Sequence, residues 1–107
     1  MKPILKPIAA LGAIVLMGAA STGMAQDERS GKQVYSSNCT ACHDTGAAGA
    51  PKIGDAESWS DRLDKGKETL YKHSINGFRA MPPMGTCSDC SEQEIKNAVD
   101  YMLSETL

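Results

Sequence analysis

The sequence has few aromatic side chains: one tryptophan, one phenylalanine and three tyrosines among 107 residues. It also lacks the alternating pattern of a β-strand, and no internal repeat or low-complexity block follows residue 25. A small chain has difficulty burying enough apolar surface to be stable by itself, and the shortage of aromatic residues adds to that difficulty. The sequence therefore predicts an all-helical protein whose core is completed by a cofactor.

The N-terminal region has the pattern of a cleaved secretion signal. It begins with two lysines, continues with the apolar stretch 8–18 and ends with small residues at positions 23–25. The apolar stretch is shorter than the about 20 residues of a membrane-spanning helix, so an uncleaved anchor is the less favoured alternative. No cysteine lies near the cleavage point, which argues against a lipoprotein. We expect residues 1–25 to be removed on export to the periplasm, leaving residues 26–107 as one domain.

The mature chain has no surplus of basic residues. Without Lys2 and Lys6, 9 basic side chains remain against 13 acidic ones, a net charge of −4. Nothing in this balance indicates nucleic acid or an anionic membrane as a partner. An acidic surface predicts partners that present a basic or neutral patch.

The most informative motif is Cys39-Thr40-Ala41-Cys42-His43, which has the C-x-x-C-H spacing of c-type haem attachment. On a helix, both cysteines and the histidine lie on one face. The two thiols can then add to the two vinyl groups of one porphyrin while the imidazole reaches its iron. The motif predicts one covalent haem c with His43 as the proximal iron ligand.

Cys87 and Cys90 form a second C-x-x-C pair, which opens other interpretations. A four-cysteine zinc site is one, but 45 positions separate Cys42 from Cys87, against about 15–20 in the usual pattern. A thioredoxin-like dithiol is another, but no βαβ pattern surrounds either pair. Because exported thiols are oxidised, we favour a Cys87–Cys90 disulfide that holds the loop before the last helix, with a redox-active dithiol as the alternative.

The sixth iron ligand has to come from another part of the chain. Met81 is favoured because two prolines follow it and restrict the backbone of its loop, so that its thioether moves little on redox change. Met84, His73 and Met102 are alternatives, as is an open position. Methionine–histidine ligation raises the reduction potential relative to two imidazoles, and six-coordinate iron favours electron transfer over oxygen chemistry.

Periodicity and end signals predict four helices, over residues 27–42, 57–64, 67–76 and 91–103. Asp55 or Ser58 is expected to cap the second helix. Ser91 and Glu94 form a capping box at the start of the last helix. Gly31 costs stability inside the first helix, so we expect a close helix crossing at that position.

The loop 45–54 contains few large side chains, so it can wrap closely around the edge of a flat cofactor. The second ring nitrogen of His43 should donate to an acceptor that fixes its tautomer. Because this loop has to return past the imidazole, the carbonyl of Pro51 is the expected acceptor.

With these motifs in place, the mature chain resembles the bacterial class I cytochromes c, and specifically the cytochrome c5 family. The matching segments are 39–43, 49–55, Trp59 with Arg62, 77–83, the Cys87/Cys90 pair and 98–102. The cysteine pair after a Met-Pro-Pro loop is the most discriminating of them. The resemblance implies about four helices wrapped around one covalent haem c, with a disulfide. It also implies the following site residues: Cys39 and Cys42 as thioethers, His43 and Met81 as axial ligands, and Pro51 and Trp59 beside the haem.

The resemblance also implies an electron-transfer protein rather than an enzyme. Such a periplasmic carrier passes single electrons between respiratory complexes and terminal oxidases or reductases, including membrane-bound partners, as a monomer or weak dimer. The apolar docking surface is expected at the following residues: Ala47, Ala48, Met81, Pro82 and Met84. Two other functions remain open: a haem-based ligand-binding or sensing protein, and a non-haem zinc or disulfide module.

Overall fold

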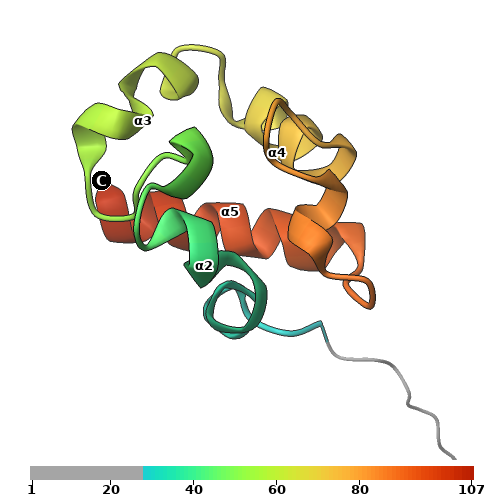
Figure 1. Ribbon diagram of the computed structural model, residues 1–107. Helices are drawn as coiled ribbons and strands as arrows, with labels where there is room; N and C mark the ends of the chain where they lie inside the picture. The colour runs from blue at the N-terminus through green and yellow to red at the C-terminus, as the bar shows by residue number, and fades with distance from the viewer. Residues whose placement is uncertain (1–27) are drawn as a thin grey trace, which may run out of the picture.

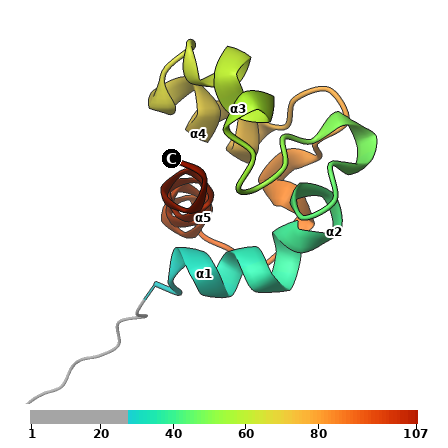
Figure 2. The same ribbon diagram turned by 90° about the vertical axis from the view of Figure 1, so that its left-hand side faces the viewer.

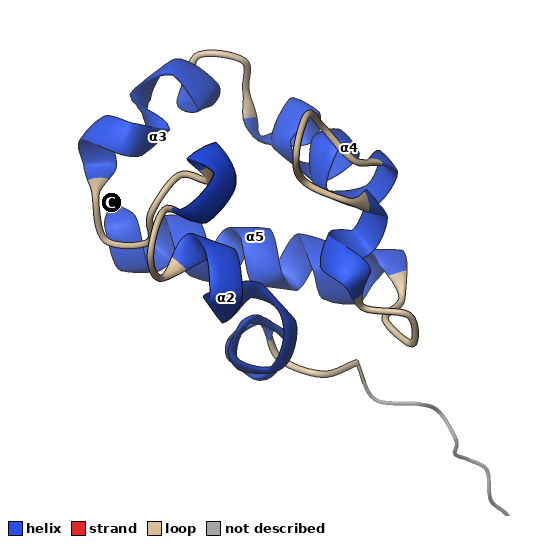
Figure 3. Ribbon diagram, in the orientation of Figure 1, coloured by secondary structure: helices blue, strands red, loops and turns tan. Residues whose placement is uncertain are grey.

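The computed structural model describes residues 28–107, and the secretion signal predicted at residues 1–25 lies outside this range. Within the described range the chain is helical, and its one strand-type pairing is an isolated bridge between Phe78 and Met81 (Figure 3). The predicted all-helical fold is therefore confirmed. The α-helices are α1 (Gly31–Val34), α2 (Thr40–His43), α3 (Ala56–Leu63), α4 (Lys67–Asn76) and α5 (Glu92–Thr106). None of the helices in this part of the chain is both long and apolar enough to cross a membrane.

Helix α5 is the central element of the domain. It runs across the molecule with α3 and α4 on one side (Figure 1), and α1 crosses its other side at a steep angle (Figure 2). Ser91 and Glu94 form the predicted capping box at its start. Its buried face consists of residues spaced three and four apart, as the sequence predicted: Ile95, Ala98, Val99, Met102 and Leu103.

The first predicted helix starts later than expected and contains an irregular turn. Ser30 ends the extended segment because its hydroxyl accepts from the Gln33 amide at 3.1 Å while the Gln33 side chain accepts from the Ser30 amide at 2.8 Å. This capping box sets the start at Gly31 rather than at residue 27. A π-helical turn, Tyr35–Cys39, then joins α1 to α2. Such widened turns often occur at functional sites, and this one ends at a haem-motif cysteine.

Gly31 lies at the crossing of α1 and α5. A Cβ atom at this position would be 2.0 Å from the Asn97 carbonyl oxygen and 2.8 Å from the Tyr101 Cβ atom. One turn further along, the ring of Tyr35 packs against that of Tyr101, with centroids 5.5 Å apart. The close crossing expected at Gly31 is confirmed, and it fixes the segment that leads to Cys39 against α5.

The N-terminal segment is also held to α5 by an ion pair. Glu94 is buried and accepts from the Arg29 backbone amide at 2.7 Å and from the Arg29 Nε at 2.8 Å. These hydrogen bonds, the Arg29 charge and the Ser91 amide lower the pKa of Glu94 to about 2. The carboxylate is therefore charged at every pH above strongly acidic values.

The start of α3 differs from the sequence-based expectation. Asp55 occupies the N-cap position, but its side chain makes no capping hydrogen bond. The Ser58 hydroxyl donates to the Asp55 carbonyl at 2.9 Å and accepts from the Lys52 amide at 3.0 Å. The predicted side-chain cap was therefore wrong, because Ser58 ties the preceding loop to the helix instead. At the end of α4, Gly77 adopts a φ of 94°, in line with the predicted stop.

Candidate cofactor site

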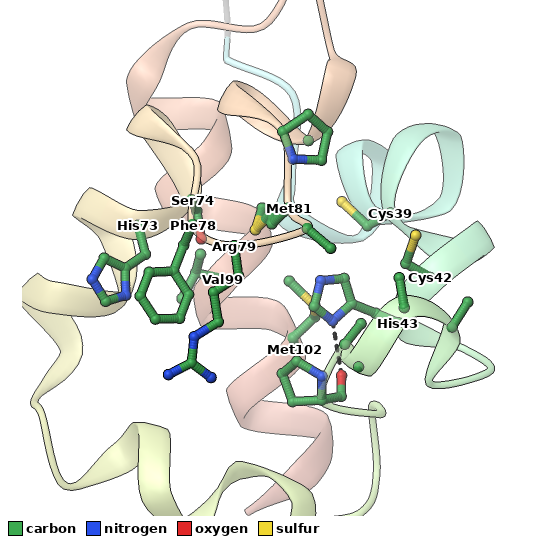
Figure 4. A pocket seen from close by; sticks show the side chains of 18 of the residues that line it. Cys39, Cys42, His43, His73, Ser74, Phe78, Arg79, Met81, Val99 and Met102 are labelled. Carbon is green, nitrogen blue, oxygen red and sulfur yellow. Dashed lines mark hydrogen bonds between the residues drawn. The ribbon is translucent and has the colours of Figure 1, made fainter.

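One cavity opens between the haem motif, the loops 47–51 and 78–86, and helices α4 and α5 (Figure 4). Its volume of about 430 Å³ lies within the range of about 300–1,000 Å³ of small-molecule sites. Apolar side chains form most of its lining, among them Leu70, Val99 and Met102. An apolar group bound in this cavity would therefore complete the hydrophobic core of a small domain that has few aromatic side chains.

Cys39, Cys42 and His43 lie together on one wall of the cavity. Neither cysteine forms a disulfide; Cys39 is half-buried and Cys42 is exposed. Two thiols one helical turn apart with an adjacent imidazole are the donor set for a covalent haem. Cys39, Cys42 and His43, as the structure places them on the cavity wall, therefore fit a covalent haem.

His43 is buried and oriented by two neighbours. Its Nδ1 donates to the carbonyl of Pro51 at 2.8 Å, as the sequence predicted. Its ring stacks on Trp59, with centroids 6.0 Å apart and planes at 22°. Burial lowers the pKa of His43, partly opposed by the hydrogen bond to Pro51 and reinforced by the charge of Arg62. The imidazole is therefore neutral and Nε2 keeps a lone pair for a metal.

The loop that carries Pro51 is held by hydrogen bonds from α3. The Trp59 Nε1 donates to the Lys52 carbonyl at 2.9 Å. Arg62 donates to the carbonyl of Ser58 at 3.1 Å and to that of Gly49 at 3.2 Å. These contacts satisfy loop carbonyls and fix the acceptor that orients His43.

The structure separates the methionines that the sequence left close together. Met81 lines the cavity, and two backbone hydrogen bonds of 2.9 Å with Phe78 fix its position. Met84 is absent from the lining and packs against a second buried cluster that includes Val34 and Ile95. Met84 is therefore not part of the cavity wall, although Gly85 and Thr86 after it are, and its expected place in the docking surface stays a prediction.

The other two ligand alternatives also lie on the cavity wall. The His73 ring stacks on Phe78, with centroids 3.9 Å apart and planes at 9°. Met102 is 3 % exposed and belongs to the buried face of α5. The side chains of His73 on α4 and Met102 on α5 are thus engaged in packing contacts. Met81 lies in a loop, and it is the one of the three residues that is not part of a helix.

Two features of the loop 78–86 could not be read from the sequence. Met84 and Thr86 adopt left-handed backbone conformations, with φ of 60° and 66°. Neither residue type favours this region, so no sequence signal indicated it. Arg79 is likewise left-handed, with φ of 55°, and its guanidinium lies 4.8 Å from the centre of the Phe78 ring. The adjacent Phe-Arg pair is the only hint of that contact.

The second cysteine pair lies between the loop 78–86 and the start of α5. Cys87 and Cys90 are joined by a disulfide, with Cys87 2 % exposed in the second core cluster. The Arg29 Nη2 approaches the Cys90 sulfur at 3.5 Å. With these two sulfurs bonded to each other, they do not form a four-cysteine zinc site with Cys39 and Cys42.

Comparisons with known proteins agree with this geometry. Residues 26–102 match the family model described as cytochrome c oxidase, cbb3-type, subunit III. The chain is 47% identical to a cytochrome c5 of Azotobacter vinelandii over 76 residues, which are 69% of this chain and 92% of that protein. It also resembles the cytochrome in a crystal structure of an electron transfer complex of nitrite reductase with cytochrome c. That match has a TM-score of 0.69 and 35% identity, and covers 77% of this chain and 100% of the other. A mono-haem ferrocytochrome c from Shewanella putrefaciens matches with a TM-score of 0.63 and 39% identity, over the same shares.

Proposed function

The chain belongs to the cytochrome c family, among the cytochromes c5, and from this premise we propose that it carries electrons in the periplasm as part of a respiratory chain. Proteins of this family are electron carriers rather than enzymes, and this one holds a single covalent haem c.

In this proposal Cys39 and Cys42 would attach the haem through thioether bonds, and His43 and Met81 would bind its iron. One observation carries this assignment: a single cavity is lined by all four residues, whereas Met84 faces another cluster. Pro51 and Trp59 orient the His43 ring, so they belong to the haem site through that residue.

The haem supplies a one-electron couple, and the chain sets the conditions under which it works. The neutral His43 ring presents Nε2, and Pro51 keeps its tautomer and direction fixed. Met81 supplies a thioether, which favours a higher reduction potential than a second imidazole. The hydrogen bonds between Met81 and Phe78 hold the loop in place, so both oxidation states can use the same geometry. A filled sixth position also argues against the ligand-sensing alternative.

The disulfide and the charge support an exported protein that meets redox enzymes. Disulfides persist outside the cytoplasm, in keeping with the secretion signal expected at residues 1–25. The acidic mature chain favours partners with basic or neutral surfaces. The cytochrome in the nitrite reductase complex docks on a reductase. By analogy, we propose that this chain, as a monomer or weak dimer, docks on terminal reductases or oxidases through exposed Ala47, Ala48 and Pro82 at the cavity.

Purification of the protein from the periplasmic fraction tests the proposal. We expect a mass that corresponds to residues 26–107 with one haem and one disulfide, and a reversible one-electron titration with a spectrum that added CO leaves unchanged. A Cys87→Ser/Cys90→Ser control should keep the haem, and a Cys39→Ser/Cys42→Ser variant should lose its covalent attachment. A colourless exported protein or a spectrum that responds to CO would contradict the proposal.

A further inference from the structure

Arg79 is a cation on the cavity wall whose donors have no acceptor within residues 28–107. No ion pair or side-chain hydrogen bond in this range involves it. The other cavity arginine, Arg62, is already bound to the carbonyls of Ser58 and Gly49. The Trp59 indole is likewise bound to the Lys52 carbonyl. Arg79 is therefore the cavity cation whose guanidinium donors are all left unused by the described residues, whereas Arg62 already uses two of its five on loop carbonyls.

The backbone at Arg79 is unfavourable for an arginine. Phe78 and Met81 exchange two backbone hydrogen bonds, so Arg79 and Ala80 form a tight two-residue turn. The φ of 55° at Arg79 is one that such turns usually give to Gly, Asn or Asp. A residue held in a sparsely populated conformation beside a ligand cavity points to a role for its side chain.

The side chain of Arg79 is also pre-positioned. The Phe78 ring lies between His73 and Arg79, with its centre 3.9 Å from the His73 centroid and 4.8 Å from the guanidinium carbon (Figure 4). Stacking of a guanidinium on an aromatic face restricts its motion while its N–H groups remain free to bind. The stack thus presents a permanent positive charge at the edge of the cavity, across from His43 in this view.

We propose that Arg79 binds one propionate carboxylate of the haem and thereby raises the reduction potential. This inference rests on the proposed function only in placing haem in this cavity. Haem carries two carboxylates, and the fork of a guanidinium matches a carboxylate in geometry and charge. The oxidised haem has one more positive charge than the reduced form. A nearby carboxylate favours the oxidised form when it is not neutralised, so Arg79 favours the reduced form.

Spectroelectrochemical titration of purified holoprotein tests the inference with three variants. Arg79→Gln keeps a long polar side chain in the same turn but removes the charge. Arg79→Lys keeps the charge, and Lys72→Gln is the matched control, because Lys72 is exposed on α4 and outside the cavity lining. At low ionic strength, the equilibrium constant for reduction by a reference couple should fall roughly two- to tenfold in Arg79→Gln. Arg79→Lys should recover most of this loss, and added salt should shrink it.

Two results would overturn the inference. The first is an equal shift in Arg79→Gln and Lys72→Gln, which would show only the loss of a surface charge. The second is an unchanged potential in Arg79→Gln with slower electron exchange with a redox enzyme, which would make Arg79 a docking residue. In either case an intact haem spectrum and a reversible titration would leave the proposed function standing.

Discussion

Gly31 approaches Asn97 so closely that a side chain at position 31 has no room: its Cβ atom would lie 2.0 Å from the Asn97 carbonyl oxygen. The contact sets the distance between α1 and α5. The same stretch of chain continues through Tyr35 to Cys39, so the crossing also fixes where the haem motif stands relative to α5. The position of the cavity wall that carries Cys39 thus depends on glycine, which has no side chain, at position 31.

Gly31→Ala should destabilise the protein by about 1–3 kcal/mol, the usual cost of overpacking. In an open helix the same change would stabilise by roughly 1 kcal/mol, so the expected sign is diagnostic. Urea unfolding followed by circular dichroism measures it. The control is Lys32→Ala, an exposed position in the same helix, which should change stability little. A Gly31→Ala variant as stable as the parent would mean that the helices can move apart at no cost.

Met81→Ala should lower the reduction potential by roughly 0.1–0.3 V, part of the about 0.8 V range that axial ligands span. It should also open the iron to CO. Met84→Ala should leave potential and spectrum nearly unchanged but cost about 1–2 kcal/mol of stability, because Met84 is half-buried against the second core cluster. Potentiometric titration with and without CO compares the two. Exchange of these phenotypes would assign Met84 as the ligand.

The sequence predicted most of the helical fold because its signals are local. The capping box at Ser91, the apolar stripe of α5 and the Gly77 stop each depend on residues a few positions apart. The haem motif is also local, since Cys39, Cys42 and His43 share one turn. Even the crossing at Gly31 was readable, because a glycine inside a helix costs stability and requires a reason.

The features that sequence reasoning missed depend on distant parts of the chain. The first helix starts at Gly31 because Ser30 and Gln33 cap each other, which outweighed the acidic residues before them. Ser58 binds the loop at Lys52 instead of capping its own helix. Met81 and Met84 look alike in sequence, and only the folded turn places Met81 at the cavity and Met84 against the second core cluster. The Arg79 stack likewise requires the approach of His73 on α4.

Removal of the disulfide should affect stability more than electron transfer. Cys87 and Cys90 close a small loop between Met84 and α5, and neither residue lines the cavity. For so short a loop, the entropic contribution is about 2 kcal/mol, lost in a Cys87→Ser/Cys90→Ser variant. Thermal unfolding should report this loss, while the reduction potential should shift far less than in Met81→Ala. A large fall in potential with unchanged stability would show that the disulfide acts on the haem site.

The ion pair between half-buried Arg29 and buried Glu94 should make stability depend on acid pH. The pKa of Glu94 is about 2 in the folded protein, below its ordinary value of 4.5. Because the pKa of Glu94 is lower in the folded protein than in the unfolded chain, the ion pair contributes its full stabilisation at pH values above about 4.5. This contribution is lost as the pH falls from about 4.5 toward 2. Urea unfolding at pH 6, 4.5 and 3 should therefore show a steeper loss of stability for the parent than for Glu94→Gln, which cannot titrate. Glu92→Gln removes an exposed carboxylate from the same helical turn and should follow the parent. Parallel curves for the parent and Glu94→Gln would show that the acid sensitivity comes from other carboxylates.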